Sequence, residues 1–175
     1  MSTWTIDASH SSITFSVRHL MISNVKGEFQ KVSGTVTWDK ANPGASSVEV
    51  EIDMNSINTR EDKRDAHLKS ADFFDTEKFP TMTFRATSVK AKDDGAELTG
   101  DLTLRGVTRS VTLEVDGPTA EQKDPWGNTR VGASASAKIK RSDFGVTWNA
   151  ALETGGVVVG DEVKIHVDVS LVKQG

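Results

Sequence analysis

Alternation of apolar and polar residues is the feature of this 175-residue chain that most restricts its fold. Ile13, Phe15 and Val17, for example, share one parity, and the residues between them are polar. A period of two places all apolar side chains on one face of a β-strand. The pattern predicts a short leading strand at 4–6 and eight long strands, at 13–17, 29–38, 48–54, 82–87, 98–104, 111–115, 131–139 and 163–171.

The segments between these strands contain residues that favour turns. Short connections of this kind favour antiparallel neighbours. Eight such strands, each with one apolar face, either stack as a sandwich or close into a barrel. Several run for about ten residues against a usual length of roughly 5–6, and this favours an all-β, antiparallel barrel. The turn segments are Asn42-Pro43-Gly44, Asp94-Gly95, Gly106, Asp116-Gly117-Pro118 and 124–127.

Two stretches interrupt the strand pattern. The apolar parity changes within 29–38, which predicts a bulge near residues 30–31. Residues 58–70 are rich in charge and contain neither Gly nor Pro, so they predict a short helical insertion. Thr59 and Asp62 have the spacing of a helix-capping pair. The helix has little apolar surface, and we expect it to lie over an end or a side of the barrel.

Composition excludes several classes of protein. The chain has no Cys, which removes disulfides, Cys nucleophiles and thiolate metal sites. With 21 Lys and Arg against 25 Asp and Glu, it lacks the basic field of a non-specific nucleic-acid binder. It has no apolar run near the roughly 18 residues of a membrane helix, and no secretory signal pattern at its start. We expect a single soluble domain over 1–175, cytoplasmic unless a signal segment was removed, with no nucleic-acid partner and no integral membrane segment.

Common catalytic motifs are absent as well. We find no phosphate loop, dinucleotide fingerprint, HExxH or Gly-x-Ser-x-Gly sequence, and no cofactor is expected. Three convergent histidines would make a metal site. The four histidines are better explained as surface or hydrogen-bonded side chains, so no metal site is predicted; they are His10, His19, His67 and His166.

His19 is the most informative of these histidines, because it continues the apolar parity of its strand to the strand end. A buried imidazole needs a polar partner, and Arg64, Asp65 and Asp143 are the candidates. Two interpretations stay open, and both can hold. His19 could be a polar latch between helix and barrel, or the polar end of a ligand cavity.

Three small residues in succession on one inward face, Ala133, Ala135 and Ala137, favour a cavity. An eight-stranded barrel has room for packed side chains or one small ligand, so a solid barrel filled by aromatic rings is the alternative. A long, narrow apolar lumen suits an extended apolar chain held by polar groups at one end. The expected pore lining is Phe15, Val17, His19, Phe29, Val36, Trp38, Phe84, Leu102, Ala133, Ala135, Ala137, Phe144 and Trp148.

The helix residues Arg64, Asp65 and His67 are charged or polar and cannot be buried without partners. We expect them to meet His19 and Asp143 at the barrel rim and to form a polar collar for a ligand headgroup. A solvated helix that does no more than keep the protein soluble is the alternative.

Nine segments, in the same order along nearly the whole chain, resemble the YceI-like family of polyisoprenoid-binding proteins. The resemblance implies a lipocalin-like barrel of eight antiparallel strands with a hydrophobic pore. It also implies non-catalytic binding, storage or transport of a long-chain amphiphile, such as a polyisoprenoid, an isoprenoid quinone or a fatty-acid derivative. Homodimers are common in the family, so a homodimer is expected. The segments are 4–7, 10–20, 27–29, 56–59, 64–68, 70–75, 79–80, 100–113 and 141–145.

A different class of function is the alternative. His19 or His67 with Asp65 or Asp143 could supply the general acid and base of a hydrolase or isomerase acting on a hydrophobic substrate. No nucleophile or oxyanion-stabilising motif accompanies them, so no catalytic residue is assigned and no enzyme is predicted.

Overall fold

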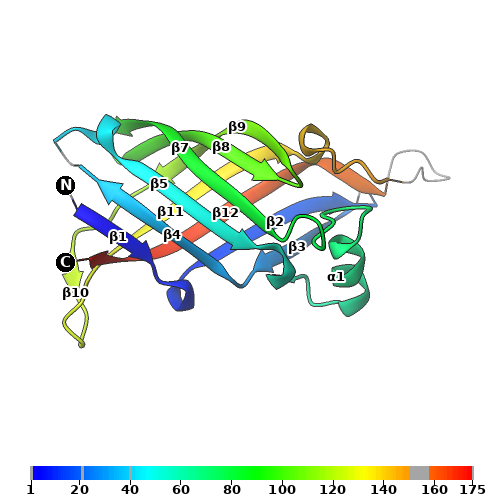
Figure 1. Cartoon of the computed structure of the whole chain (residues 1–175), viewed down its shortest axis with the longest axis horizontal. Coiled ribbons are helices and arrows are strands. Elements are labelled where there is room, and N and C mark those ends of the chain that lie inside the picture. Colours follow the sequence, from blue (N-terminus) through cyan, green and yellow to red (C-terminus); the bar gives the residue numbers. More distant parts are fainter. Residues whose placement is uncertain (1, 21, 40, 150–157, 175) are drawn as a thin grey trace.

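The computed structural model describes residues 2–20, 22–39, 41–149 and 158–174. These residues form a strongly twisted β-structure with a helix at one end (Figure 1). The helix is α1 (Asp62–Lys69), and 3₁₀ turns occupy Ala8–His10, Pro43–Ala45, Met54–Ser56 and Arg141–Phe144. The strands are β1 (Ser2–Ile6), β2 (Ser12–His19), β3 (Ser23–Phe29), β4 (Val32–Trp38), β5 (Ser47–Asp53), β6 (Ile57–Asn58), β7 (Thr81–Lys92), β8 (Gly95–Leu104), β9 (Val107–Asp116), β10 (Gln122–Lys123), β11 (Thr129–Lys140) and β12 (Val159–Gln174).

The described strands close into a barrel because β12 is paired along both of its edges. One edge pairs with β11, and the other pairs first with β2 and then with β1. β1 and β2 therefore act as one interrupted strand, and β3 with β4, and β5 with β6, do the same. Each of the resulting eight strands lies antiparallel to the next one along the chain. The predicted eight-stranded antiparallel barrel is confirmed.

The interruption between β3 and β4 is the bulge that the change of parity predicted. The N–H of Gln30 donates to the carbonyl of Ser56 (3.2 Å), and the N–H of Lys31 donates to the Ser56 hydroxyl (3.1 Å). Ser56 ends the 3₁₀ turn that separates β5 from β6. Two neighbouring strands thus bend at the same level of the barrel.

The barrel wall is not uniformly hydrogen-bonded. β8 and β9 pair over ten residues, from Gly95↔Asp116 to Leu104↔Val107. β9 and β11 pair over only three, from Ser134↔Asp116 to Ser136↔Glu114. The seam between β9 and β11 is therefore much shorter than its neighbour.

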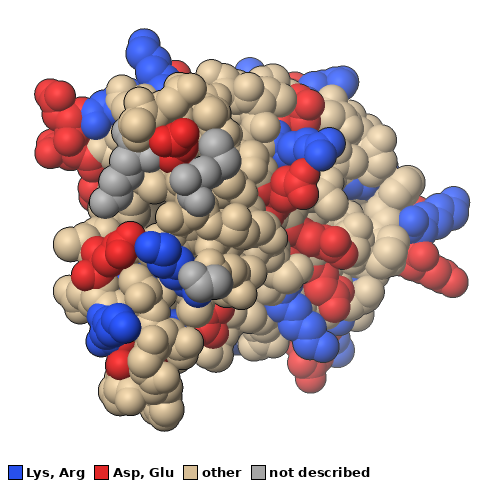
Figure 2. Space-filling model, turned by 60° about the vertical axis from the view of Figure 1, so that its left-hand side comes forward, with Lys and Arg blue, Asp and Glu red and all other residues tan. Residues whose placement is uncertain are grey.

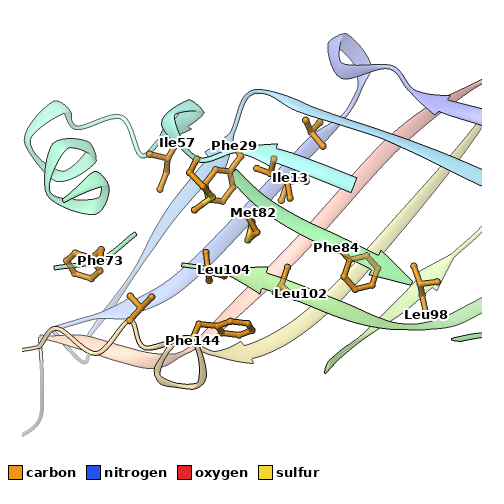
Figure 3. Packing of buried hydrophobic residues seen from close by; sticks show 14 residues of the cluster. Ile13, Phe29, Ile57, Phe73, Met82, Phe84, Leu98, Leu102, Leu104 and Phe144 are labelled. Atoms are coloured by element: carbon orange, nitrogen blue, oxygen red, sulfur yellow. The ribbon is translucent and has the colours of Figure 1, made fainter. Parts of the chain in front are cut away.

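The hydrophobic core lies inside the barrel, where the predicted alternation places it. The largest cluster includes Phe29 of β3, Met82 and Phe84 of β7, and Leu102 of β8 (Figure 3). A smaller cluster, around Trp4, lies where the first and last strands meet. Each such side chain contributes about 1.5–3 kcal/mol to the stability of the fold when it is buried, so this interior dominates the stability of the barrel. On the face of the surface shown in Figure 2, basic and acidic side chains are interspersed.

Helix α1 begins later than the sequence predicts. Its N-cap is Glu61, whose carboxylate accepts from the N–H groups of Lys63 (3.3 Å) and Arg64 (2.7 Å). The prediction that Thr59 and Asp62 cap the helix is therefore wrong, because Glu61 already accepts from the free N–H groups of the first turn. No helix in the described ranges is long and apolar enough to cross a bilayer.

Candidate ligand-binding lumen

In the part of the chain that the structure describes, two cavities lie end to end inside the barrel. Chamber 1, of about 230 Å³, lies toward the chain termini, and chamber 2, of about 240 Å³, lies toward α1. Ile13, Met82 and Ile165 line both chambers, so the cavities meet at these three side chains, which we call the waist. Ile13 and Met82 approach each other from β2 and β7 in Figure 3. The lumen is thus a divided cavity along the barrel axis.

Chamber 1 is almost entirely apolar. Its polar lining residues among those described are Ser46, Thr119, Glu121 and Ser134, and every other lining residue is aliphatic, aromatic or proline. The indole N–H of Trp38 is buried and has no hydrogen-bond partner in the described structure. Six residues of the expected pore lie here, namely Val36, Trp38, Phe84, Leu102, Ala133 and Ala135.

Chamber 2 combines apolar walls with basic side chains. Five residues of the expected pore lie here, namely Phe15, Val17, His19, Phe29 and Trp148. α1 contributes Arg64 and His67, and the end of β11 leads into Arg141. This chamber therefore has the hydrophobic character of chamber 1 together with hydrogen-bond donors.

Arg141 is a buried guanidinium that the sequence analysis did not select. It is 7 % exposed, and burial lowers its pKa, which the charge of Asp161 partly opposes. The sequence alternation does indicate an inward position for Arg141, because this residue continues the inward parity of β11 beyond Ile139. Among the described residues, its donors meet backbone carbonyls, those of Gly160 (2.8 Å), Val146 (2.9 Å), Trp148 (2.9 Å) and Val159 (3.3 Å).

Two helix residues hold α1 to the segment before it. Thr59 is 4 % exposed, and both its N–H (2.9 Å) and its hydroxyl donate to the carboxylate of Asp65. Arg64 donates to the hydroxyl (2.8 Å) and the carbonyl (2.6 Å) of Thr59. The expected contact of Asp65 with His19 or Asp143 is wrong, because Thr59, free of the N-cap role, takes up the carboxylate.

His67 links the helix to two aromatic rings. Its ring stands edge-on to Phe73 and to Trp148, with centroids 4.9 Å away in each case. Its Nε2 lies 2.9 Å from the carboxylate of Asp72. His67 is therefore the contact between α1 and the far wall of chamber 2.

The family model of the YceI-like domain matches residues 4–171. The chain belongs to the YceI-like family. It is 40% identical over 168 residues to Protein YceI of Salmonella newport (strain SL254), which covers 96% of this chain and 84% of the relative. Protein YceI of Salmonella arizonae (strain ATCC BAA-731 / CDC346-86 / RSK2980) has the same identity and the same coverage.

Solved structures of similar proteins agree with the barrel. A YceI protein of Campylobacter jejuni has a TM-score of 0.73 and 32% identity, and the match covers 90% of each chain. BcnA of Burkholderia cenocepacia has a TM-score of 0.77 and 24% identity, over 94% of this chain and 98% of BcnA. A polyisoprenoid binding domain from Saccharophagus degradans has a TM-score of 0.69 at 18% identity, over 98% of each chain. The last two, at these identities, support the fold alone.

Four residues of the expected site, Asp65, Ala137, Asp143 and Phe144, line neither chamber of this YceI-like barrel in the described structure. Phe144 is 1 % exposed and packs within the core (Figure 3). Ala137 follows the last residue pair of β9 and β11, at Ser136↔Glu114. Asp143 is exposed and is therefore not part of a collar. Of the expected collar, only Arg64 and His67 line a chamber, and Asp65 lies behind them at Thr59.

His19 lies at the end of β2 and lines chamber 2, as its parity predicts. Its ring has no hydrogen-bond partner among the described residues, so the structure does not support the latch interpretation. No group of three or more His, Asp or Glu side chains in the described ranges is placed to hold a metal ion. His19 is thus a polar group at the end of an apolar chamber.

Proposed function

We propose that this YceI-like protein binds one long-chain hydrophobic amphiphile in the barrel lumen, for storage or transport and without chemical change. The observation that carries the proposal is the pair of apolar chambers joined at the waist. An extended hydrocarbon chain fits such a shape. A longer chain removes more apolar area from water when it binds, and the complex is more stable in proportion to that area. The Saccharophagus degradans structure, which shares this fold, is described as a polyisoprenoid binding domain, and polyisoprenoids belong to the proposed class of ligand.

The test begins with purification from the native host under non-denaturing conditions. Organic extraction of the denatured protein, followed by mass spectrometry, should recover a prenyl or fatty amphiphile in stoichiometric amount. The delipidated protein should then bind the recovered compound again and return it with its mass unchanged. Failure to recover or rebind any long-chain compound would contradict the proposal.

The alternative of a hydrolase or isomerase rests on residues that the structure does not bring together. Asp65 is bonded to Thr59, and Asp143 is exposed. The imidazole–carboxylate pair at chamber 2 is instead His67 with Asp72, and both of these side chains are open to solvent. A change in the mass of the returned ligand, lost in His67→Ala, would favour the enzyme over the carrier. The homodimer and the cytoplasmic location stay predictions.

A further inference from the structure

Ionisable residues are distributed very unevenly along the lumen. Chamber 1 has one ionisable lining residue among those described, Glu121, and no basic one. Chamber 2 has no Asp or Glu among its described lining residues. Its polar lining consists of three arginines and two histidines, namely Arg18, His19, Arg64, His67 and Arg141. Among the described lining residues of this largely apolar lumen, the basic groups thus lie at one end.

The carboxylates of Asp65 and Asp161, which belong to the surroundings of Arg64 and Arg141, have other hydrogen-bond partners. Asp65 accepts from Thr59, and Asp161 accepts from the N–H (2.9 Å) and hydroxyl (2.7 Å) of Ser142. Within the described ranges, neither Arg64 nor Arg141 has a carboxylate at ion-pair distance. Both are held by uncharged oxygen atoms, so neither forms an ion pair with a described carboxylate, and Asp161 acts on Arg141 only through its charge at longer range.

A guanidinium charge in apolar surroundings is costly, and carbonyl dipoles offset only part of that cost. An anion in chamber 2 would supply the rest, since a hydrogen bond to an anion is about twice as strong as a neutral one. Arg64 has donors to spare, because Thr59 takes its Nε and one Nη2 hydrogen, and its Nη1 bonds to no described residue. Two adjacent N–H groups match the two oxygen atoms of a carboxylate or a phosphate.

We infer that the ligand is an anionic amphiphile, with a carboxylate or phosphate headgroup in chamber 2 and a tail that passes the waist into chamber 1. The inference rests on the proposed function and adds the class and the orientation of the ligand. The basic end recognises the headgroup, and the apolar end receives the tail. Arg64 is the headgroup ligand, and Arg141 supplies positive charge from the chamber wall.

The experiment compares ligands that share a tail and differ in headgroup, on the delipidated full-length chain. Hexadecanoate is compared with hexadecan-1-ol, and farnesyl phosphate with farnesol, by displacement of a fluorescent fatty probe at pH 8. For at least one pair, the affinity for the acid should be at least about ten times the affinity for the alcohol. A charge-assisted hydrogen bond contributes enough free energy for that ratio. The pair with the larger ratio identifies the headgroup as carboxylate or phosphate.

Arg64→Gln should lower the affinity for the acid far more than the affinity for the alcohol, and so remove that preference. Arg64→Lys should retain part of it, because the charge stays and the planar fork is lost. Lys63→Gln is the matched control, because Lys63 is the exposed neighbour on α1 and its loss changes the net charge equally. Helix content by circular dichroism shows whether each variant keeps α1.

Four results would overturn the inference. Acid and alcohol could bind equally, which refutes the anionic headgroup and leaves the proposed function standing. Lys63→Gln could weaken the acid as much as Arg64→Gln, which assigns the effect to surface charge. Trp38→Phe, rather than Arg64→Gln, could abolish the preference, which places the headgroup at the unpaired indole N–H of chamber 1. Binding of neither acid nor alcohol would refute the proposed function as well.

Discussion

Arg130 Nη1 lies 2.7 Å from the carboxylate of Asp7, and the same guanidinium reaches Asp124 at 2.7 Å through its Nε. The contacts join the 3₁₀ turn after β1 to the β10–β11 hairpin. Hydrogen bonds from His10, Ser9 and Arg130 hold the pKa of Asp7 well below its usual range. The bond from Arg130 is the largest cause that lowers the pKa of Asp124 to about 2.

A pKa that is lower in the folded than in the unfolded protein stabilises the fold at high pH. The contribution is complete above the ordinary Asp pKa of about 3.9 and is lost as the pH falls through the folded value. The difference in free energy of unfolding between wild type and Arg130→Gln should therefore be constant above about pH 5 and shrink toward pH 2. Urea titrations across this range measure it. Arg109→Gln, at an exposed position of β9, is the control. A similar pH dependence in Arg109→Gln would show that the effect does not come from the bonds of Arg130 to Asp7 and Asp124.

Asp65→Ala tests how α1 is held. The substitution leaves the N–H and the hydroxyl of buried Thr59 without their acceptor, which costs about 1–3 kcal/mol locally. Hydrogen exchange over residues 59–69 should quicken and ligand release should accelerate, while the barrel stays folded. Asp62→Ala, at an exposed position in the first turn, should change both far less. Unchanged exchange and release in Asp65→Ala would show that Thr59 does not hold the helix.

Ala135→Phe tests whether chamber 1 is open in solution. The new ring enters the chamber that Ala135 lines, so ligand capacity should fall, with little loss of stability. A solid core would instead be overpacked and lose about 1–3 kcal/mol. Ser136→Phe places the same ring on the exposed side of β11 and serves as the control. Thermal unfolding and ligand titration of both variants distinguish the outcomes; full capacity in Ala135→Phe would refute the assignment of this wall.

The waist predicts a dependence on tail length. A larger side chain at Met82, as in Met82→Phe, narrows the passage between the chambers. Affinity for a sixteen-carbon acid should fall more than affinity for an eight-carbon acid, which chamber 2 alone accommodates. Isothermal titration with both acids gives the ratio, and Thr83→Phe on the outer face of β7 is the control. An equal loss for both tails would mean that the chambers are not used in series.

The barrel and its lining could be predicted from the sequence because strand parity is a local property. The alternation of β11 placed Ala133 and Ala135 inward, and extended to Arg141 it would have found the buried guanidinium too. The collar was less predictable. The partner of Asp65 depends on where α1 begins, and Glu61 decided this through two hydrogen bonds. The position of Asp143 depends on how the 3₁₀ turn after β11 packs, which periodicity does not describe.

The short seam between β9 and β11 bears on how large a guest the barrel can admit. Parting the wall there separates three residue pairs, against ten between β8 and β9. Widening of the lumen therefore costs least in one direction, sideways along this seam. The size of ligand that the lumen admits then depends on how far β9 and β11 separate. The volume of the two chambers in this structure is a lower bound on that size.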